Sequence, residues 1–140
     1  MITRVLVGGL IFKNGKILLL KRTETKKFLP GYYDLPGGKV EPGEDPNHAL
    51  ISEVKEETGL DIEIVKPYNV WTDTLEYNNG KEVVKECIIE IDFMLKIKKG
   101  RAIKLSPEEH SEYKWVDKKG IPSKISPQLK KTIIKAFEVV

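Results

Sequence analysis

Residues 37–60 read GGKVEPGEDPNHALISEVKEETGL, and this stretch decides the expected fold. Two glycines open it, and a helix is predicted over residues 45–58. Asp45 is a favourable N-cap, Pro46 suits the first helical position, and Gly59 follows as the residue that ends the helix. The stretch therefore predicts a glycine loop that leads into a well-capped helix.

The predicted helix carries three carboxylates on one face. Glu53, Glu56 and Glu57 are related by steps of three and four residues, so they are neighbours on the helix surface. Such a run is usually a solvated, charged face. Here, however, the carboxylates repel one another and lie near the carboxyl end of the helix, where the helix dipole disfavours negative charge. A divalent cation reverses the sign of these energies, since Mg²⁺ and Mn²⁺ prefer carboxylate oxygens, and this pattern indicates metal-assisted phosphate chemistry.

A second face of the same helix is apolar and is expected to pack on a sheet. Its members are Leu50, Ile51, Val54 and Thr58.

The rest of the chain is richer in strands than in helices. Residues 2–12 and 16–20 are expected to form a hairpin, because Asn14-Gly15 between them favours a type I′ turn. Further strand-forming segments are residues 32–35, 61–65, 69–72, 83–97 and 113–116, and residues 127–137 show the apolar spacing of a second helix. Helices scattered between strands predict a mixed α/β domain.

Composition excludes several classes of protein. The 140 residues are enough for one domain with its own core, and 24 basic against 21 acidic residues give a net charge of +3, too balanced to indicate a nucleic-acid partner. The apolar runs are too short for a membrane helix, and no signal peptide is read. The single cysteine, Cys87, allows no intramolecular disulfide, which fits a reducing compartment. We therefore expect a soluble cytoplasmic domain.

The spacing of residues 38–60 resembles the Nudix box. That signature is a Gly, five residues, a Glu, seven residues, and then Arg-Glu-apolar-any-Glu-Glu-any-Gly-apolar. Gly38, Glu44 and the segment 52–60 match every fixed position except one, because Ser52 stands where the family has arginine. The resemblance implies an α/β/α sandwich around a mixed sheet, as a single domain over residues 1–140.

The resemblance also implies an activity. Proteins of this family cleave nucleoside diphosphates linked to another moiety, with Mg²⁺ or Mn²⁺ as cofactor. We expect a small nucleotide as substrate, a nucleoside triphosphate or an oxidised one, with no nucleic-acid or membrane partner. A homodimer is compatible with the resemblance. ADP-ribose and dinucleoside polyphosphates remain alternative substrates: Tyr77 lies 17 residues after Leu60, as in similar diadenosine-polyphosphate hydrolases, whereas Leu75 stands where ADP-ribose-cleaving relatives have proline.

Roles are carried over residue by residue. The resemblance implies metal ligation and catalysis by Glu53 and Glu57, with Glu56 variably, joined by the carbonyl of Gly37. Glu53 or a downstream acid, for which Glu109 and Glu112 are the candidates, would be the general base. Expected substrate contacts are Arg22, Tyr33 and Lys39, and expected structural support of the box comes from Gly38, Glu44, Ser52 and Gly59. His110 lies between Glu109 and Ser111 and is expected at the surface rather than as a ligand, with a role beside the site as the alternative.

Serine at position 52 cannot supply the positive charge of an arginine. Ser52 precedes Glu56 by four residues, so an arginine there would pair with a box carboxylate. Without that pairing, we expect raised carboxylate pKa values and a stronger dependence on bound metal. The same departure leaves open a non-catalytic module that binds nucleotide for regulation.

Overall fold

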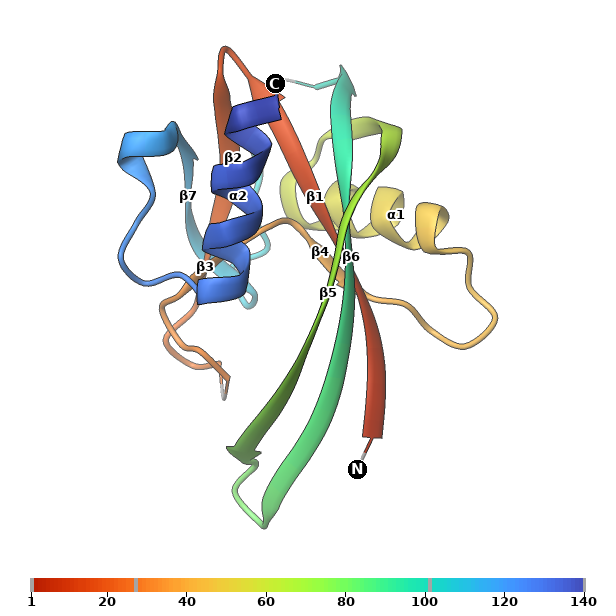
Figure 1. Cartoon of the computed structure of the whole chain (residues 1–140), viewed down its shortest axis with the longest axis vertical. Coiled ribbons are helices and arrows are strands. Elements are labelled where there is room, and N and C mark those ends of the chain that lie inside the picture. The colour runs from red at the N-terminus through yellow and green to blue at the C-terminus, as the bar shows by residue number, and fades with distance from the viewer. Residues whose placement is uncertain (1, 27, 101, 140) are drawn as a thin grey trace.

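A computed structural model describes residues 2–26, 28–100 and 102–139 (Figure 1). The elements in chain order are β1 (Ile2–Lys13), β2 (Lys16–Arg22), β3 (Tyr33–Asp34), β4 (Gly37–Lys39), α1 (Pro46–Thr58), β5 (Asp61–Asn78), β6 (Val83–Lys99), β7 (His110–Val116), the 3-10 helix η1 (Lys118–Gly120) and α2 (Pro127–Val139).

The strands of the described residues form one seven-stranded mixed sheet. The main order is β3-β2-β1-β6-β5, with β4 paired to β1 and β7 paired to β2. β1 and β6 run parallel, and the other pairs are antiparallel. The predicted hairpin between β1 and β2 is confirmed, because Asn14 and Gly15 both have the positive φ that a type I′ turn requires, at 52° and 75°.

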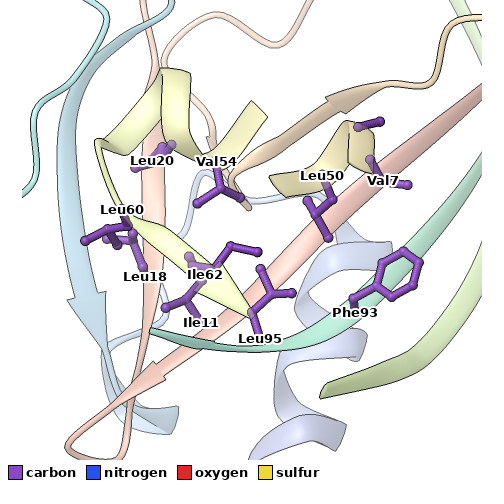
Figure 2. Close-up of a cluster of buried hydrophobic side chains, with 11 residues drawn as sticks. Val7, Ile11, Leu18, Leu20, Leu50, Val54, Leu60, Ile62, Phe93 and Leu95 are labelled. Carbon is purple, nitrogen blue, oxygen red and sulfur yellow. The ribbon is translucent and has the colours of Figure 1, made fainter. Parts of the chain in front are cut away.

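Each face of the sheet is covered by one helix. Side chains alternate along the central strands, so Val7 and Ile11 of β1 pack under α1, whereas Leu10 belongs to the cluster that contains α2. Figure 2 shows the first cluster, in which Leu50 and Val54 of α1 face the sheet. The expected sandwich around a mixed sheet is therefore confirmed.

Helix α1 begins and ends where the sequence predicts. The Asp45 carboxylate accepts a hydrogen bond from the backbone N–H of Asn47 at 2.9 Å, and Gly59 closes the helix at φ 80°. One residue of the predicted apolar face was assigned wrongly. Ile51 is exposed, whereas Leu50 and Val54 pack in the cluster under α1.

The segments predicted at 61–65 and 69–72 belong to one long strand. β5 runs through Pro67, and its pairing with β6 shifts register on either side of that residue. Proline lacks an N–H, which an edge strand with bulges tolerates. With β6 and the first residues of β1, β5 forms an arm that extends beyond both helices (Figure 1).

Neither helix in the described part of the chain combines the length and apolar character needed to cross a bilayer.

Candidate active site

A cavity of about 590 Å³ opens beside the acidic face of α1. Its wall comes from α1, from β4 and the loop before it, from the β1, β5 and β6 arm, from the end of β2 and the loop after it, and from residues just before β7 and at the start of α2. The residues predicted from sequence that line this cavity are Arg22, Tyr33, Gly37, Gly38, Lys39, Glu53, Glu56, Glu57 and Glu109. The fold thus gathers residues from four other segments around the three carboxylates of α1.

Glu57 is the buried member of the acidic face. Its Oε1 accepts a hydrogen bond from the backbone N–H of Gly37 at 2.8 Å, and its Oε2 lies 3.6 Å from Nδ1 of His110. Burial raises the pKa of Glu57 to about 9; the hydrogen bond from Gly37 opposes this rise, and the charges of nearby carboxylates add to it.

Glu53 lies against the glycine loop. A Cβ built on Gly38 would lie 2.7 Å from Cδ of Glu53, so only glycine at position 38 allows this approach. Burial raises the pKa of Glu53, and the neighbouring charges of Glu56, Glu109 and Glu44 raise it further. The raised carboxylate pKa values expected from Ser52 are therefore present at Glu53 and Glu57, but burial is their largest cause.

The donor set fits a divalent cation. Three carboxylates that repel one another border one cavity, and the pKa values of two of them, Glu53 and Glu57, are raised by burial and by the neighbouring negative charges. Among the described residues, no three acidic, histidine or cysteine side chains already form a metal-binding cluster. A cation would therefore have to draw the carboxylates together, and Glu56, which is exposed, is the one least held by packing.

His110 was predicted at the surface, and this prediction was wrong. It is 4% exposed, and its Nε2 lies 3.3 Å from Oδ1 of Asp34 while Nδ1 faces Glu57. The residues on either side of His110 are polar, so the local sequence does not indicate that it is buried. His110 lies at the start of β7 and pairs there with Arg22 of β2. Asp34, likewise missed, gives no local signal either.

The two candidate downstream acids are in different surroundings. Glu109 lines the cavity and pairs with Lys26; that hydrogen bond is the largest cause of its lowered pKa. Glu112 is not among the described residues that line the cavity, and it accepts a hydrogen bond from the hydroxyl of Tyr33. Burial and this bond raise the pKa of Tyr33 to about 12. Glu109 is therefore the better placed acid.

The remaining predicted residues are held by local contacts. Arg22 donates from Nε to the carbonyl of Phe28 at 3.0 Å and from Nη1 to Asp34 at 3.3 Å, which ties the loop before β3 to β2. Nζ of Lys39 lies 3.6 Å from Oε1 of Glu41. Glu44 accepts a hydrogen bond from the N–H of Glu41 at 3.0 Å, and Ser52 is half-buried on α1.

The part of the cavity on the arm contains two charged residues that sequence reasoning missed, Arg4 and Glu86. Glu86 is buried and accepts hydrogen bonds from Nε of Arg4 at 2.8 Å and from the hydroxyl of Tyr77 at 3.0 Å. The ring of Tyr77 also lies 6.0 Å from that of Phe28. These pairs depend on strand register, which the sequence patterns did not provide.

Replacing Arg4 with methionine should destabilise the fold in a pH-dependent way. Burial alone would raise the pKa of Glu86, but the bonds from Arg4 and Tyr77 outweigh it and lower that pKa below 4.5. The stabilisation is therefore present above pH 4.5 and is lost as the pH falls further. We expect Arg4→Met to cost about 1–2 kcal/mol at pH 7, discounted for the one-third exposure of Arg4, and less at pH 3.5. Urea unfolding at both pH values measures this, with Lys118→Met, which breaks an exposed pair with Glu138, as the control. An equal loss at both pH values would contradict the assignment.

Comparison with protein families identifies the domain. The NUDIX domain model matches residues 2–137. The chain is 33% identical over 118 residues to the nucleoside triphosphatase NudI of Escherichia coli O17:K52:H18 (strain UMN026 / ExPEC), which covers 81% of each protein. It is also 50% identical over 56 residues to an ADP-ribose pyrophosphatase of Methanocaldococcus jannaschii, a match that covers 40% of this chain and 32% of that protein.

Comparison with solved structures supports the fold. A MutT NUDIX hydrolase from Burkholderia pseudomallei superposes with a TM-score of 0.78 at 24% identity, covering 96% of this chain and 98% of that one.

Proposed function

Because the chain belongs to the NUDIX domain family, whose members generally use divalent metal ions, we propose that it is a Mg²⁺- or Mn²⁺-dependent pyrophosphohydrolase acting on a nucleoside triphosphate, oxidised forms included. The observation that carries the proposal is the single cavity that joins the α1 carboxylates to aromatic and cationic side chains. Carboxylates suit a metal that binds phosphates, and aromatic rings suit a base. The similarity to a nucleoside triphosphatase over most of both chains supports this substrate class.

The residues of the cavity have separate roles in the proposed reaction. Glu53, Glu57 and, less firmly, Glu56 would hold the cation with the carbonyl of Gly37, and the cation would supply Lewis-acid stabilisation of the anhydride oxygens. Glu53 or Glu109 accepts the proton of the attacking water. The N–H of Gly37 donates to Glu57 and holds it in place, and Nδ1 of His110 lies 3.6 Å from the other carboxylate oxygen of Glu57. Arg22, Lys39 and Tyr33 contact the substrate.

A panel assay tests the function. Nucleoside triphosphates, ADP-ribose and a dinucleoside tetraphosphate are incubated with Mg²⁺ and then Mn²⁺, and released phosphate and pyrophosphate are measured. We expect turnover of at least one triphosphate that disappears when the metal is chelated. Turnover of ADP-ribose alone would instead favour an ADP-ribose pyrophosphatase, the activity named for the relative from Methanocaldococcus jannaschii. A chain that binds nucleotide but turns over no compound would be a regulatory module, the alternative that Ser52 favours.

We also propose that residues 1–140 form one domain with its box at 38–60, and that the protein is cytoplasmic, with a small nucleotide rather than a nucleic acid or membrane as its partner. A homodimer is the proposed assembly. Residues 1 and 140 lie outside the described part of the chain.

Replacing Ser52 with arginine should raise turnover. An arginine four residues before Glu56 would pair with a carboxylate of the acidic face and orient it, and lost orientation of metal ligands typically costs about tenfold or more. We expect a roughly tenfold increase in kcat and a lower Mg²⁺ requirement. Ser52→Gln is the control, since it lengthens the side chain without charge. Equal rates in the arginine and glutamine variants would show that charge at position 52 is unimportant.

A further inference from the structure

The end of the cavity on the arm is built around one guanidinium. Arg4 of β1 lines the cavity and is one-third exposed, and its Nε donates to Oε1 of Glu86 at 2.8 Å. The hydroxyl of Tyr77 donates to the same oxygen at 3.0 Å. Arg4 and Tyr77 thus reach Glu86 from the two strands on either side of β6. The proposed hydrolysis uses none of these three residues.

Glu86 leaves most of the hydrogen-bond donors of Arg4 unused. A guanidinium has five N–H groups and no acceptor, and one carboxylate takes at most a parallel pair of them. Within the described part of the chain, Glu86 is the one ion-pair partner of Arg4. The bond from Nε therefore fixes the guanidinium on the cavity wall, and further N–H groups remain for a ligand.

The positive charge of Arg4 is already balanced. Burial alone would raise the pKa of Glu86, but the hydrogen bonds from Arg4 and Tyr77 outweigh it and lower that pKa, so Glu86 is ionised at neutral pH. Lys39, whose charge also lowers the pKa of Glu86, lies 3.6 Å from Glu41. Since each cation has its own carboxylate, this end of the cavity attracts a second phosphate weakly. Its free N–H groups suit a neutral acceptor such as a ring carbonyl.

Apolar side chains lie beside the guanidinium. Leu6 is on the same face of β1, and Leu75 pairs with Glu86 across β5 and β6; both line the cavity. The ring of Phe28, from the loop before β3, lies 6.0 Å from that of Tyr77. Flat, apolar walls of this kind suit a purine or pyrimidine ring better than a ribose or a phosphate.

The guanidinium lies at a suitable distance from the metal-binding face. Gly37 donates to Glu57 of α1 and pairs with Gly8 across β4 and β1. Arg4 precedes Gly8 by four residues on β1, which is roughly 13 Å along the strand and on the same face. A nucleotide with its phosphates at α1 can therefore reach Arg4 with its base.

We propose that Arg4 is a base-recognition residue that donates hydrogen bonds to the ring carbonyl of hypoxanthine, guanine, uracil or thymine. Adenine and cytosine carry an amino group at the corresponding position, so they set donor against donor and are disfavoured. A guanidinium stays protonated and offers no acceptor, so it cannot adapt to the amino group. The inference rests on the proposed function insofar as the ligand is a nucleotide, and it adds which bases are preferred and which residue selects them.

Binding without turnover tests the selection. Nucleoside monophosphates contain no anhydride bond, so calorimetry can compare IMP with AMP and UMP with CMP while Mg²⁺ is present. Within each pair the bases differ by one exchange of a carbonyl for an amino group. A hydrogen bond from a charged donor corresponds to about tenfold in Kd, and we expect that preference for the carbonyl-bearing member of at least one pair. Equal Kd values within both pairs, or no binding of any of the four, would overturn the proposal.

Arg4→Gln separates recognition from folding. Glutamine offers both a donor and an acceptor, so the ratio of Kd values within a pair should fall to parity. A merely structural role for Arg4 would weaken both members of a pair equally and leave the ratio unchanged. Lys85→Gln is the matched control, because Lys85 is exposed on the neighbouring position of the arm and does not line the cavity. Its ratio should equal that of the wild type.

A second variant keeps the charge beside the buried Glu86. Should Arg4→Gln fail to fold, Arg4→Lys retains a cation for Glu86 but replaces the planar set of donors with one ammonium group. The ratio should then fall severalfold in a folded protein, which urea unfolding verifies. An unchanged ratio in either folded variant overturns the proposal.

The two proposals fail differently. Turnover of a triphosphate, with equal binding of IMP and AMP and of UMP and CMP, would remove the role of Arg4 and leave the hydrolase. Selective binding that Arg4→Gln abolishes, without turnover of any triphosphate, would remove the hydrolase and support base recognition by Arg4.

Discussion

Glu57→Gln is expected to abolish turnover and, at the same time, to stabilise the metal-free protein. Glutamine cannot hold a divalent cation as a carboxylate does, so a rate loss of about a thousandfold is expected. The amide fits the same position, because its oxygen can accept from Gly37 while its nitrogen can donate to Nδ1 of His110. That nitrogen lies 3.6 Å from Oε2 of Glu57 and makes no hydrogen bond with the described residues.

The stability gain has a defined pH window. The pKa of Glu57 rises from 4.5 to about 9 on folding, so the folded chain binds the extra proton and stability falls as pH rises between these values. Glutamine has no such cost, and at pH 7 the variant should be more stable by about 3 kcal/mol. Urea unfolding with a chelator at pH 4.5 and pH 8 measures the difference, which should be small at the lower pH.

Added Mn²⁺ provides the internal control for this variant. The ion should raise the Tm of the wild type and leave that of Glu57→Gln unchanged, since binding to the folded state stabilises it. A variant that is less stable than the wild type at pH 8 without metal would contradict the buried, uncompensated charge assigned to Glu57.

Gly38→Ala should reduce turnover about a hundredfold while changing stability little. The new Cβ meets Cδ of Glu53, the far part of a flexible side chain, so the glutamate can move aside at small cost to folding. Displacement of a reacting group by about 1 Å typically costs a factor of a hundred in rate. Measurement of kcat together with urea unfolding separates the two effects.

Gly43→Ala is the matched control in the same loop. No heavy atom lies within 4 Å of a Cβ at position 43, but its φ of 80° strains an alanine. We expect a loss of about 1 kcal/mol in stability with kcat unchanged. If Gly38→Ala lost stability and kept its rate, the contact with Glu53 would have no role in catalysis.

The local features of the fold could be predicted from sequence. The caps of α1, the turn at Asn14-Gly15 and the helix over Pro127–Val139 depend on neighbouring residues, and each was found close to its predicted place. The path of β5 through Pro67 could not be predicted. Pairing with β6 and bulges on both sides of the proline offset the missing N–H, and this tertiary effect leaves no local pattern.

The residues of the candidate site also fall into two groups, those that the sequence pattern identified and those that only strand pairing brings together. The acidic face of α1 follows from helical periodicity alone, so Glu53, Glu56 and Glu57 were identified together. His110 and Asp34 meet Glu57 only through the pairing of β7 and β3 with β2. Glu90 and Asp92 of β6 lie beside Gly8 because β1 pairs with β6, although the paired residues are some 80 positions apart in the chain. No spacing within one segment reveals such contacts.

The parallel pairing of β1 with β6 also determines when the chain can fold during synthesis. Residues 2–11 occupy the middle of the sheet, yet their partners are residues 86–95. The hairpin of β1 and β2 can form early from local contacts, but its other edge stays unpaired until most of the chain has left the ribosome. Closing that long loop is a slow step, so we expect β1–β6 pairing to limit the folding rate, and a nascent chain that pauses before residue 95 would expose an apolar edge prone to aggregation.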